Sequence, residues 1–257
     1  MSQRVDYDSI AENYPNRYER SDYSGVGRAL AAFVGGDGHT PAGRDVLEVG
    51  CGTGHWLDFL RRAGASVHGI DSSAGMLRIA RTLVPAALLV RGFAEALPVR
   101  SERVDRIFCI NALHHFTDPS AFFGEARRIL RSTGGVWTVG LDPHAARDRW
   151  WIYDYFPEAL VADRGRYPAA STIRAMLDAA GFERCETREV QRLPRRLPVN
   201  EVLAKGFVDR GHTSQLMVIA DEEYERGMQN IRAAAARDPE LVLEADLTLY
   251  GTVGWVA

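Results

Sequence analysis

Lysine is almost missing from this 257-residue sequence, in which Lys205 stands alone and arginine supplies nearly all of the positive charge. We interpret this imbalance as a coding bias of the source genome. Basic residues number 31 against 34 acidic ones, so the formal net charge of −3 gives no general basic field for binding nucleic acid. Nucleic acid is therefore not expected as a partner.

Cysteine is scarce, and long hydrophobic runs are absent. The three cysteines, Cys51, Cys109 and Cys185, are odd in number and lie in apolar or glycine-rich contexts, which is typical of reduced thiols in a cytoplasmic protein. No apolar run is long enough to cross a membrane, and residues 1–10 are too polar for a secretory signal. We expect a cytoplasmic protein that does not enter a membrane, and the sequence leaves its oligomeric state open.

The chain is organised around a strand, a glycine loop and a helix at residues 45–63. Val46, Leu47 and Val49 form a short apolar run that suits a buried parallel strand, and three glycines follow at alternate positions from Gly50 to Gly54. Apolar residues at helical spacing then occupy residues 55–63, and Gly64 ends the segment. This order lets backbone N–H groups and a helix N-terminus approach an anionic or polar ligand.

Two features bear on which ligand the loop binds. A dinucleotide fingerprint reads Gly-x-Gly-x-x-Gly, but His55 occupies the place of its third glycine, which weakens the pyrophosphate interpretation. A second strand, residues 66–70, ends at Asp71, whose carboxylate can accept from both hydroxyls of a ribose. A nucleoside cofactor is predicted, and a NAD-dependent oxidoreductase stays open as an alternative.

The motif Glu48-x-Gly50-x-Gly52-x-Gly54, followed by Asp71, resembles the cofactor site of class I S-adenosylmethionine-dependent methyltransferases, and most closely their small-molecule, type 11-like branch. The resemblance covers residues 5–141. It implies S-adenosyl-L-methionine as the cofactor, with its ribose on Asp71, its methionine portion against Glu48 and its adenine near Phe93. The positions that it assigns to the cofactor are Tyr14, Arg17, Glu48, Gly50, Cys51, Gly52, Gly54, Asp71, Ser72, Met76, Phe93, Ala94 and Asn111.

One position departs from the family pattern. The family usually has an acid directly after Gly92, where it binds the adenine amino group, whereas this chain has Phe93. Adenine recognition then falls to backbone groups around Ala94, to Glu95, or to the Phe93 ring packed on the base. A plain core role for Phe93 fits the sequence equally well.

The resemblance also implies that a leading segment folds over the cofactor. Residues 7–14 read Tyr-Asp-x-Ile-Ala-x-x-Tyr, and the tyrosine spacing within residues 5–20 predicts an amphipathic helix that Pro15 breaks or kinks. Tyr14 and Arg17 are the candidates for contacts near the methionine end. Packing of the tyrosines on the edge of the domain is the alternative.

Strands and helices alternate through the first half of the chain, which implies a parallel sheet with helices on both faces. The expected fold class is α/β, a Rossmann-like seven-stranded, mostly parallel sheet with an antiparallel last strand and an extra helical cap. The first five strands are predicted at 46–49, 66–70, 87–90, 104–110 and 136–141. Later segments predict a helix at 172–180, a strand at 182–190, a stiff basic loop at 192–198 and a last strand at 245–256.

We expect a single methyltransferase domain over residues 1–257, with a helical cap at 1–43, a cofactor-binding core at 44–141 and a C-terminal half at 142–257. The C-terminal half contains an aromatic segment, 142–166, and an inserted segment, 199–238, that looks helical around 201–208 and 222–236. Aromatics of the first segment can line an acceptor pocket or simply pack a peripheral helix. The candidate acceptor contacts are Trp150, Trp151, Tyr153 and Tyr155.

Methyl transfer from a sulfonium is an in-line displacement, so the protein chiefly aligns the acceptor and excludes water. His115, just past the fourth strand, is the best placed general base, with His114 next, and a non-catalytic role is the alternative. No defensible ligand spacing indicates a metal. We predict methyl transfer to the O, N or C atom of a small molecule, such as a quinone or natural product. A non-catalytic scaffold that binds S-adenosylmethionine is a further alternative.

Overall fold

The computed structural model describes residues 5–15, 18, 21–36 and 40–256. The chain divides into two compact units, each described by itself below. The core unit comprises residues 6–140, 170–191 and 249–256, and the second unit comprises residues 141–169 and 192–248 together with Val5. The predicted single domain, with divisions near 43 and 141, stays a prediction.

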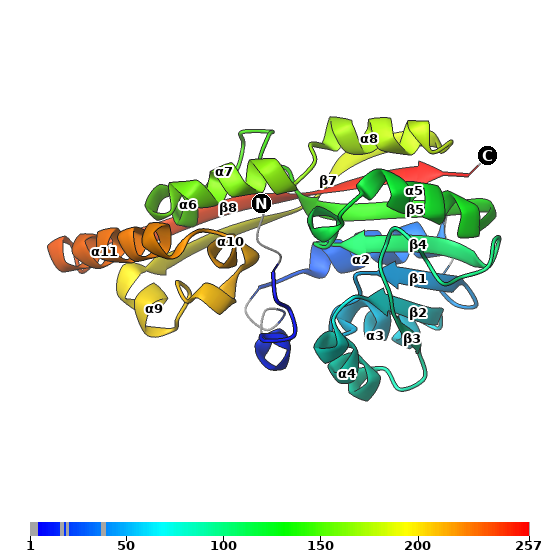
Figure 1. The fold of residues 1–257 in the computed structure, drawn as a ribbon, viewed down its shortest axis with the longest axis horizontal. Helices are drawn as coiled ribbons and strands as arrows, with labels where there is room; N and C mark the ends of the chain where they lie inside the picture. Colours follow the sequence, from blue (N-terminus) through cyan, green and yellow to red (C-terminus); the bar gives the residue numbers. More distant parts are fainter. Residues whose placement is uncertain (1–4, 16–17, 19–20, 37–39, 257) are drawn as a thin grey trace. The chain divides into compact units, whose positions relative to one another are not determined.

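The described strands form one eight-stranded sheet in the order β3-β2-β1-β4-β5-β8-β6, with β7 paired to β8 (Figure 1). Neighbours among the first five strands pair in parallel, and β6 is antiparallel to β8. The strands are β1 (Asp45–Val49), β2 (Ser66–Asp71), β3 (Leu88–Arg91), β4 (Val104–Ile110), β5 (Leu130–Leu141), β6 (Arg149–Trp150), β7 (Glu183–Pro198) and β8 (Val242–Trp255). The predicted α/β class with a mostly parallel sheet is confirmed, and the two-residue β6 raises the expected seven strands to eight.

Helices of the core unit cover the sheet in two groups, because α3 contacts α2 and α4 while α5 contacts α8. These helices are α2 (Ser24–Gly35), α3 (His55–Arg62), α4 (Ala74–Leu83), α5 (Pro119–Ile129) and α8 (Ala170–Ala179), and two short 3₁₀ helices are η1 (Ala11–Asn13) and η2 (Leu113–His115). The second unit contains α6 (Trp151–Tyr155), α7 (Pro157–Arg166), α9 (Val199–Ala204), η3 (Arg210–His212), α10 (Ser214–Met217) and α11 (Asp221–Arg237). The helix predicted around 222–236 is confirmed by α11, whereas that around 201–208 is confirmed only to Ala204, where α9 ends and turns follow.

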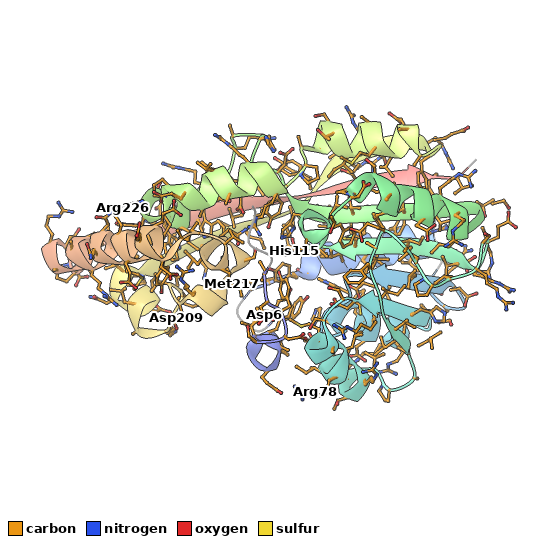
Figure 2. The ribbon with its side chains drawn as sticks, viewed as in Figure 1. Asp6, Arg78, His115, Asp209, Met217 and Arg226 are labelled. Atoms are coloured by element: carbon orange, nitrogen blue, oxygen red, sulfur yellow. The ribbon has the colours of Figure 1, made fainter. Side chains whose placement is uncertain are left out.

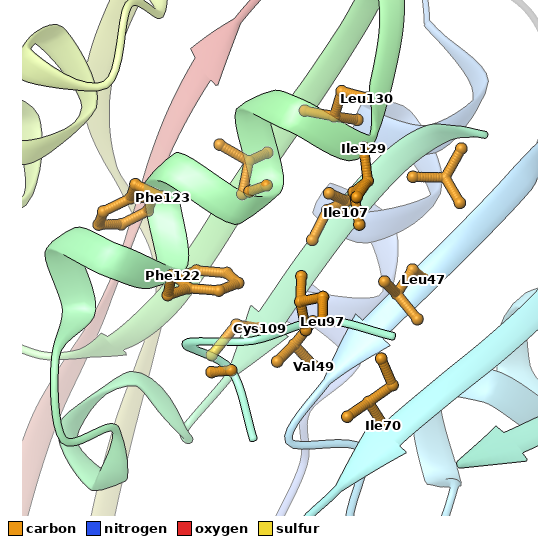
Figure 3. Close-up of a cluster of buried hydrophobic side chains, with 14 of the residues drawn as sticks. Leu47, Val49, Ile70, Leu97, Ile107, Cys109, Phe122, Phe123, Ile129 and Leu130 are labelled. Atoms are coloured by element: carbon orange, nitrogen blue, oxygen red, sulfur yellow. The ribbon is translucent and has the colours of Figure 1, made fainter. Parts of the chain in front are cut away.

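The main hydrophobic cluster lies between the parallel strands and α5. Figure 3 shows Phe122 and Phe123 on α5 and Ile107 and Cys109 on β4 as members of this cluster, and all four side chains are fully buried. Because β1 lies between β2 and β4, the strand order reverses beside β1, and open α/β sheets bind ligands beyond the carboxyl ends of strands at such a reversal. The glycine loop leaves β1 at this place.

The prediction of a loop over 192–198 is wrong, because β7 continues to Pro198. Exposure alternates along this segment with the period of two that a strand requires, and Arg196 pairs with Glu244 of β8. Among the described strands β7 pairs with β8 alone, so it lies at an edge where a proline without an N–H is tolerated. The two prolines in this segment led to the wrong prediction.

The predicted helix over 5–20 is also wrong for its first half, where residues 7–10 form turns. The Asp6 carboxylate accepts from the backbone N–H groups of Asp8 and Ser9 at 3.1 and 3.4 Å, and this local bonding competes with a helix. The N-cap of α4 is Ser73, whose hydroxyl accepts from Met76 N at 3.0 Å.

Candidate cofactor site

The glycine loop passes closer to its surroundings than a side chain would allow. Gly50, Gly52 and Gly54 all have positive φ, at +76°, +51° and +85°. A Cβ atom on Gly50 would lie 2.5 Å from Cβ of Ala112, which follows β4. The loop therefore presents bare main chain at the carboxyl ends of β1 and β4.

Asp71 is joined directly to this loop. Gly52 N donates to Oδ2 at 2.8 Å, and Ser73 N donates to Oδ1 at 2.9 Å. Burial raises the pKa of Asp71, and backbone N–H groups of Ser73, Gly52 and Ser72 oppose that rise. The glycine loop and Asp71, both singled out in the sequence, thus meet in one place. The oxygens of the Asp71 carboxylate retain lone pairs that can accept from further donors.

Glu48 of β1, two residues before Gly50, is only 2% exposed. Its Oε2 atom has no hydrogen-bond partner among the described residues. Burial, and after it the charge of Asp71, raises the pKa of Glu48 well above the ordinary carboxyl range. A buried acceptor without a donor is costly, so this atom suits a ligand that brings a donor or a positive charge.

The segment before η1 docks onto α4 and the loop. Asp8 Oδ1 accepts from the Ser73 hydroxyl at 2.6 Å and from Gly75 N at 2.7 Å, and these bonds lower the pKa of Asp8. Tyr14 lies over the loop, since a Cβ on Gly52 would be 3.7 Å from its ring. Arg78 of α4, labelled in Figure 2, pairs with Glu12 at 2.5 Å. Arg17, the other predicted contact of this segment, lies outside the described residues.

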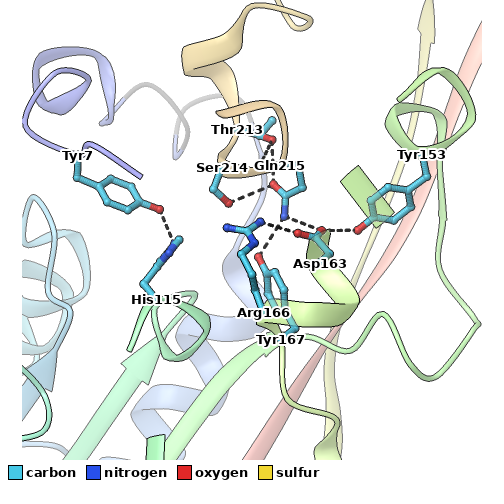
Figure 4. Close-up of polar contacts among 9 residues, drawn as sticks. All are labelled: Tyr7, His115, Tyr153, Asp163, Arg166, Tyr167, Thr213, Ser214 and Gln215. Atoms are coloured by element: carbon cyan, nitrogen blue, oxygen red, sulfur yellow. Dashed lines mark hydrogen bonds and ion pairs between the residues drawn. The ribbon is translucent and has the colours of Figure 1, made fainter. Parts of the chain in front are cut away.

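His115 of η2 is held by Tyr7 of the same unit. The Tyr7 hydroxyl and His115 Nε2 are 2.6 Å apart (Figure 4), and the two rings meet edge to face at 5.0 Å. The His114 ring lies 3.9 Å from that of His115. Sequence reasoning missed Tyr7 and Asp8 as site residues, although both stand in the Tyr-Asp start of the leading motif.

The other predicted cofactor contacts have varied surroundings. Phe93 is 57% exposed, so the alternative of a core role for it is wrong. Asn111 has φ of +53°, and its N–H donates to Val139 O at 2.8 Å. Ser72 is exposed, whereas Cys51, Met76 and Ala94 are buried. Their contacts with a cofactor stay predictions.

Aromatics of the 142–166 segment pack within the second unit. Trp151 is 6% exposed and belongs to its hydrophobic cluster, while Trp150, Tyr153 and Tyr155 are partly buried against that cluster. A contact of these side chains with an acceptor stays a prediction. Among the described residues, no group of His, Cys, Asp and Glu could hold a metal, and no helix is long and apolar enough to span a membrane.

A polar network lies inside the second unit, centred on Asp163, which is fully buried. Its carboxylate accepts from Arg166 at 2.5 Å, from the Tyr153 hydroxyl at 2.7 Å and from Gln215 Nε2 at 3.0 Å (Figure 4). Gln215 Nε2 also donates to the Tyr167 hydroxyl at 3.1 Å. Burial, then the Asp163 charge and hydrogen bond, raises the pKa of Tyr153. The network therefore keeps Tyr153 protonated and joins α6, α7 and α10.

Known proteins are similar in sequence to the part of this chain that contains the glycine loop. Residues 47–138 match the family model described as a methyltransferase domain. An uncharacterised methyltransferase of Synechocystis sp. is 31% identical over 147 residues, which are 54% of this chain and 67% of that protein. A probable S-adenosylmethionine-dependent methyltransferase of Mycolicibacterium smegmatis is 34% identical over 101 residues, and this match spans only 39% of each protein.

A solved structure shares the fold over most of the chain. It is described as a methyltransferase from an antibiotic biosynthesis pathway of Anabaena variabilis, and it is similar with a TM-score of 0.69 at 23% identity. The match covers 88% of this chain and 96% of that one, and at this identity it shows the fold alone. Taken with the two sequence relatives and the matched domain, these likenesses identify the family: the chain belongs to the class I S-adenosylmethionine-dependent methyltransferases.

Proposed function

We propose that this chain transfers a methyl group from S-adenosylmethionine to a small-molecule acceptor. The observation that carries the proposal is the direct contact of the glycine loop with Asp71, beside the buried and unpartnered Glu48 oxygen. Family membership supports the same reaction. The loop gives main-chain approach, Asp71 gives acceptors for ribose hydroxyls, and Glu48 gives a buried acceptor for a cationic amine.

The residues of this site suit each part of the proposed cofactor. Asp71 would hold the ribose, Glu48 with Gly50 and Gly52 would hold the methionine portion, and the 92–94 segment would lie at the base. When bound, the cofactor supplies an activated methyl group on a sulfonium. The chain's own task is then to orient the acceptor and exclude water, for which Tyr14 and the docked leading segment are well placed.

We assign the general base to the pair of Tyr7 and His115. A neutral imidazole that accepts the Tyr7 hydroxyl at Nε2 carries its own hydrogen on Nδ1. As the O–H or N–H bond of an acceptor breaks, its proton goes to the Tyr7 oxygen, while the Tyr7 proton goes to His115 Nε2. For the acceptor we propose a small, fairly apolar molecule.

Replacing Asp71 by alanine is expected to weaken binding of S-adenosylmethionine by about a hundredfold, because two hydrogen bonds to a charged acceptor are lost. Isothermal calorimetry with S-adenosylmethionine and S-adenosylhomocysteine measures this change. The Asp71→Asn variant keeps one acceptor and the side-chain volume, so it should lose less. Affinity of Asp71→Ala equal to that of the parent would refute the ribose assignment, and NADH in the same titration tests the oxidoreductase alternative.

His115→Ala is expected to lower kcat by about a hundredfold, the usual range for loss of a general base, with cofactor affinity unchanged. The assay measures S-adenosylhomocysteine formed with the best acceptor from a screen of phenols, amines and acids. The kcat of Tyr7→Phe should be similarly low. The kcat of the double variant should be no lower, because the effects of substituting residues that act as a unit do not add. A kcat of His115→Ala near the parent value would exclude the base role.

A further inference from the structure

Phe93 is a large apolar side chain that the fold leaves outside the core, just beyond the carboxyl end of β3. It is 57% exposed, whereas its neighbour Ala94 is 5% exposed and joins the main hydrophobic cluster. Leu83 and Leu88 are also exposed, but they lie at the end of α4 and at the opposite end of β3. An aromatic face exposed at the ligand-binding end of a sheet is suited to a flat ligand.

The backbone holds Phe93 beside the ribose carboxylate. Gly92 N donates to the carbonyl oxygen of Asp71 at 3.0 Å, and Asp71 is the register partner of Arg91. The glycine loop reaches Asp71 from β1, whereas residues 92–94 reach it from β3, and β2 lies between these two strands. A nucleoside with its ribose on Asp71 and its sulfur toward the loop therefore directs its base toward Phe93.

The acid that follows Phe93 most closely in the chain, Glu95, already accepts from backbone N–H groups. Glu95 Oε1 accepts from Thr117 N at 2.6 Å and from Asp118 N at 3.1 Å. Asp118 in turn caps α5 by accepting from Ala121 N at 3.0 Å. If Glu95 Oε1 or Asp118 Oδ1 turned toward a ligand, bonds that fix the segment after η2 would be lost. The side chain that the segment offers to a base is thus an aromatic ring.

We propose that Phe93 stacks on the adenine ring and that the chain binds the purine without a side-chain contact to its 6-amino group; this inference rests on the proposed function. Selectivity for the base then comes from stacking, which depends on the ring face and not on its exocyclic donor. A cofactor analogue altered at this amino group binds as well as the natural one.

The test is calorimetry with S-adenosylhomocysteine and its 6-deamino analogue, in which hydrogen replaces the amino group. The two dissociation constants of the parent protein are expected to agree within about threefold, because no hydrogen bond to a charged group is lost. Phe93→Ala should weaken both ligands together by about tenfold, since a base loses its aromatic platform. Phe93→Asp should make S-adenosylhomocysteine bind about tenfold tighter than the analogue, because a carboxylate now accepts from the amino group.

Leu88→Asp is the matched control, since it places the same carboxylate on an exposed position at the other end of β3 and should leave the ratio unchanged. Two results would overturn the inference: parent protein that prefers S-adenosylhomocysteine by tenfold or more, or Phe93→Ala that binds as tightly as the parent. Failure of the parent to bind either ligand would instead refute the proposed function. Thermal unfolding of each variant confirms that it is folded.

Discussion

Asp163→Ala is expected to lower the free energy of unfolding by about 3–5 kcal/mol, the range observed when one partner of a buried ion pair is removed. Asp163 is fully buried and is the hydrogen-bond partner of Arg166, Tyr153 and Gln215. Arg166 Nε and Nη1 have no partner among the described residues, so loss of the carboxylate leaves its charge with nothing but the Tyr167 ring, 5.7 Å away. Urea unfolding with a check of the slope measures the change.

Two variants separate this ion-pair effect from simple loss of packing. Asp163→Asn combined with Arg166→Met removes both charges and keeps an acceptor for Tyr153, so it should be more stable than Asp163→Ala. Asp154→Ala, at an exposed position on α6, should lie within about 0.5 kcal/mol of the parent. A loss below about 1 kcal/mol for Asp163→Ala would mean that the network does not stabilise the second unit.

Gly50→Ala is expected to destabilise the core unit by about 2–5 kcal/mol and to abolish cofactor binding. Positive φ costs an L-residue about 1–2 kcal/mol, and a methyl group forced into packed atoms costs about 1–3 kcal/mol more. Here the added Cβ would lie 2.5 Å from Ala112 Cβ, on the segment that leads to η2. Because the loop has to move, its contact with Asp71 moves too. Thermal unfolding and calorimetry with S-adenosylhomocysteine measure the two effects.

The control for this substitution is Gly181→Ala. Gly181 has a similar φ of +81°, but a Cβ there would meet no described atom within 4 Å. Gly181→Ala should lower the free energy of unfolding by only the cost of positive φ, about 1–2 kcal/mol, and should leave cofactor binding intact. Equal losses for the two variants would show that the clash with Ala112 contributes nothing.

The sequence predicts those parts of the fold in which a local pattern and the tertiary structure agree. Apolar runs mark β1, β2 and β4, and the strand of residues 104–110 has the predicted ends. The direct contact between the glycine loop and Asp71 also follows from spacing, because two neighbouring parallel strands bring their carboxyl ends to one edge.

Features that depend on distant partners were not predictable in this way. Nothing near Tyr7 in the sequence indicates that its hydroxyl meets His115, more than a hundred residues away. The extension of β7 to Pro198 depends on β8, whose Glu244 and Asp246 pair with the arginines that suggested a loop. Trp151, predicted to contact an acceptor, is buried in the cluster of its own unit because α9 and α11 supply matching apolar faces.

The raised pKa of Glu48 gives the site a charge state that depends on its occupant. A raised value favours the neutral acid while no cation is near, and a positively charged ligand beside Oε2 favours the carboxylate. Arrival of a sulfonium or ammonium group would then expel a proton, and departure of the ligand would take one up. With the proposed cofactor, ligand exchange at this buried acid would therefore also be proton exchange, and the exchanged proton would keep the interior close to electrical neutrality.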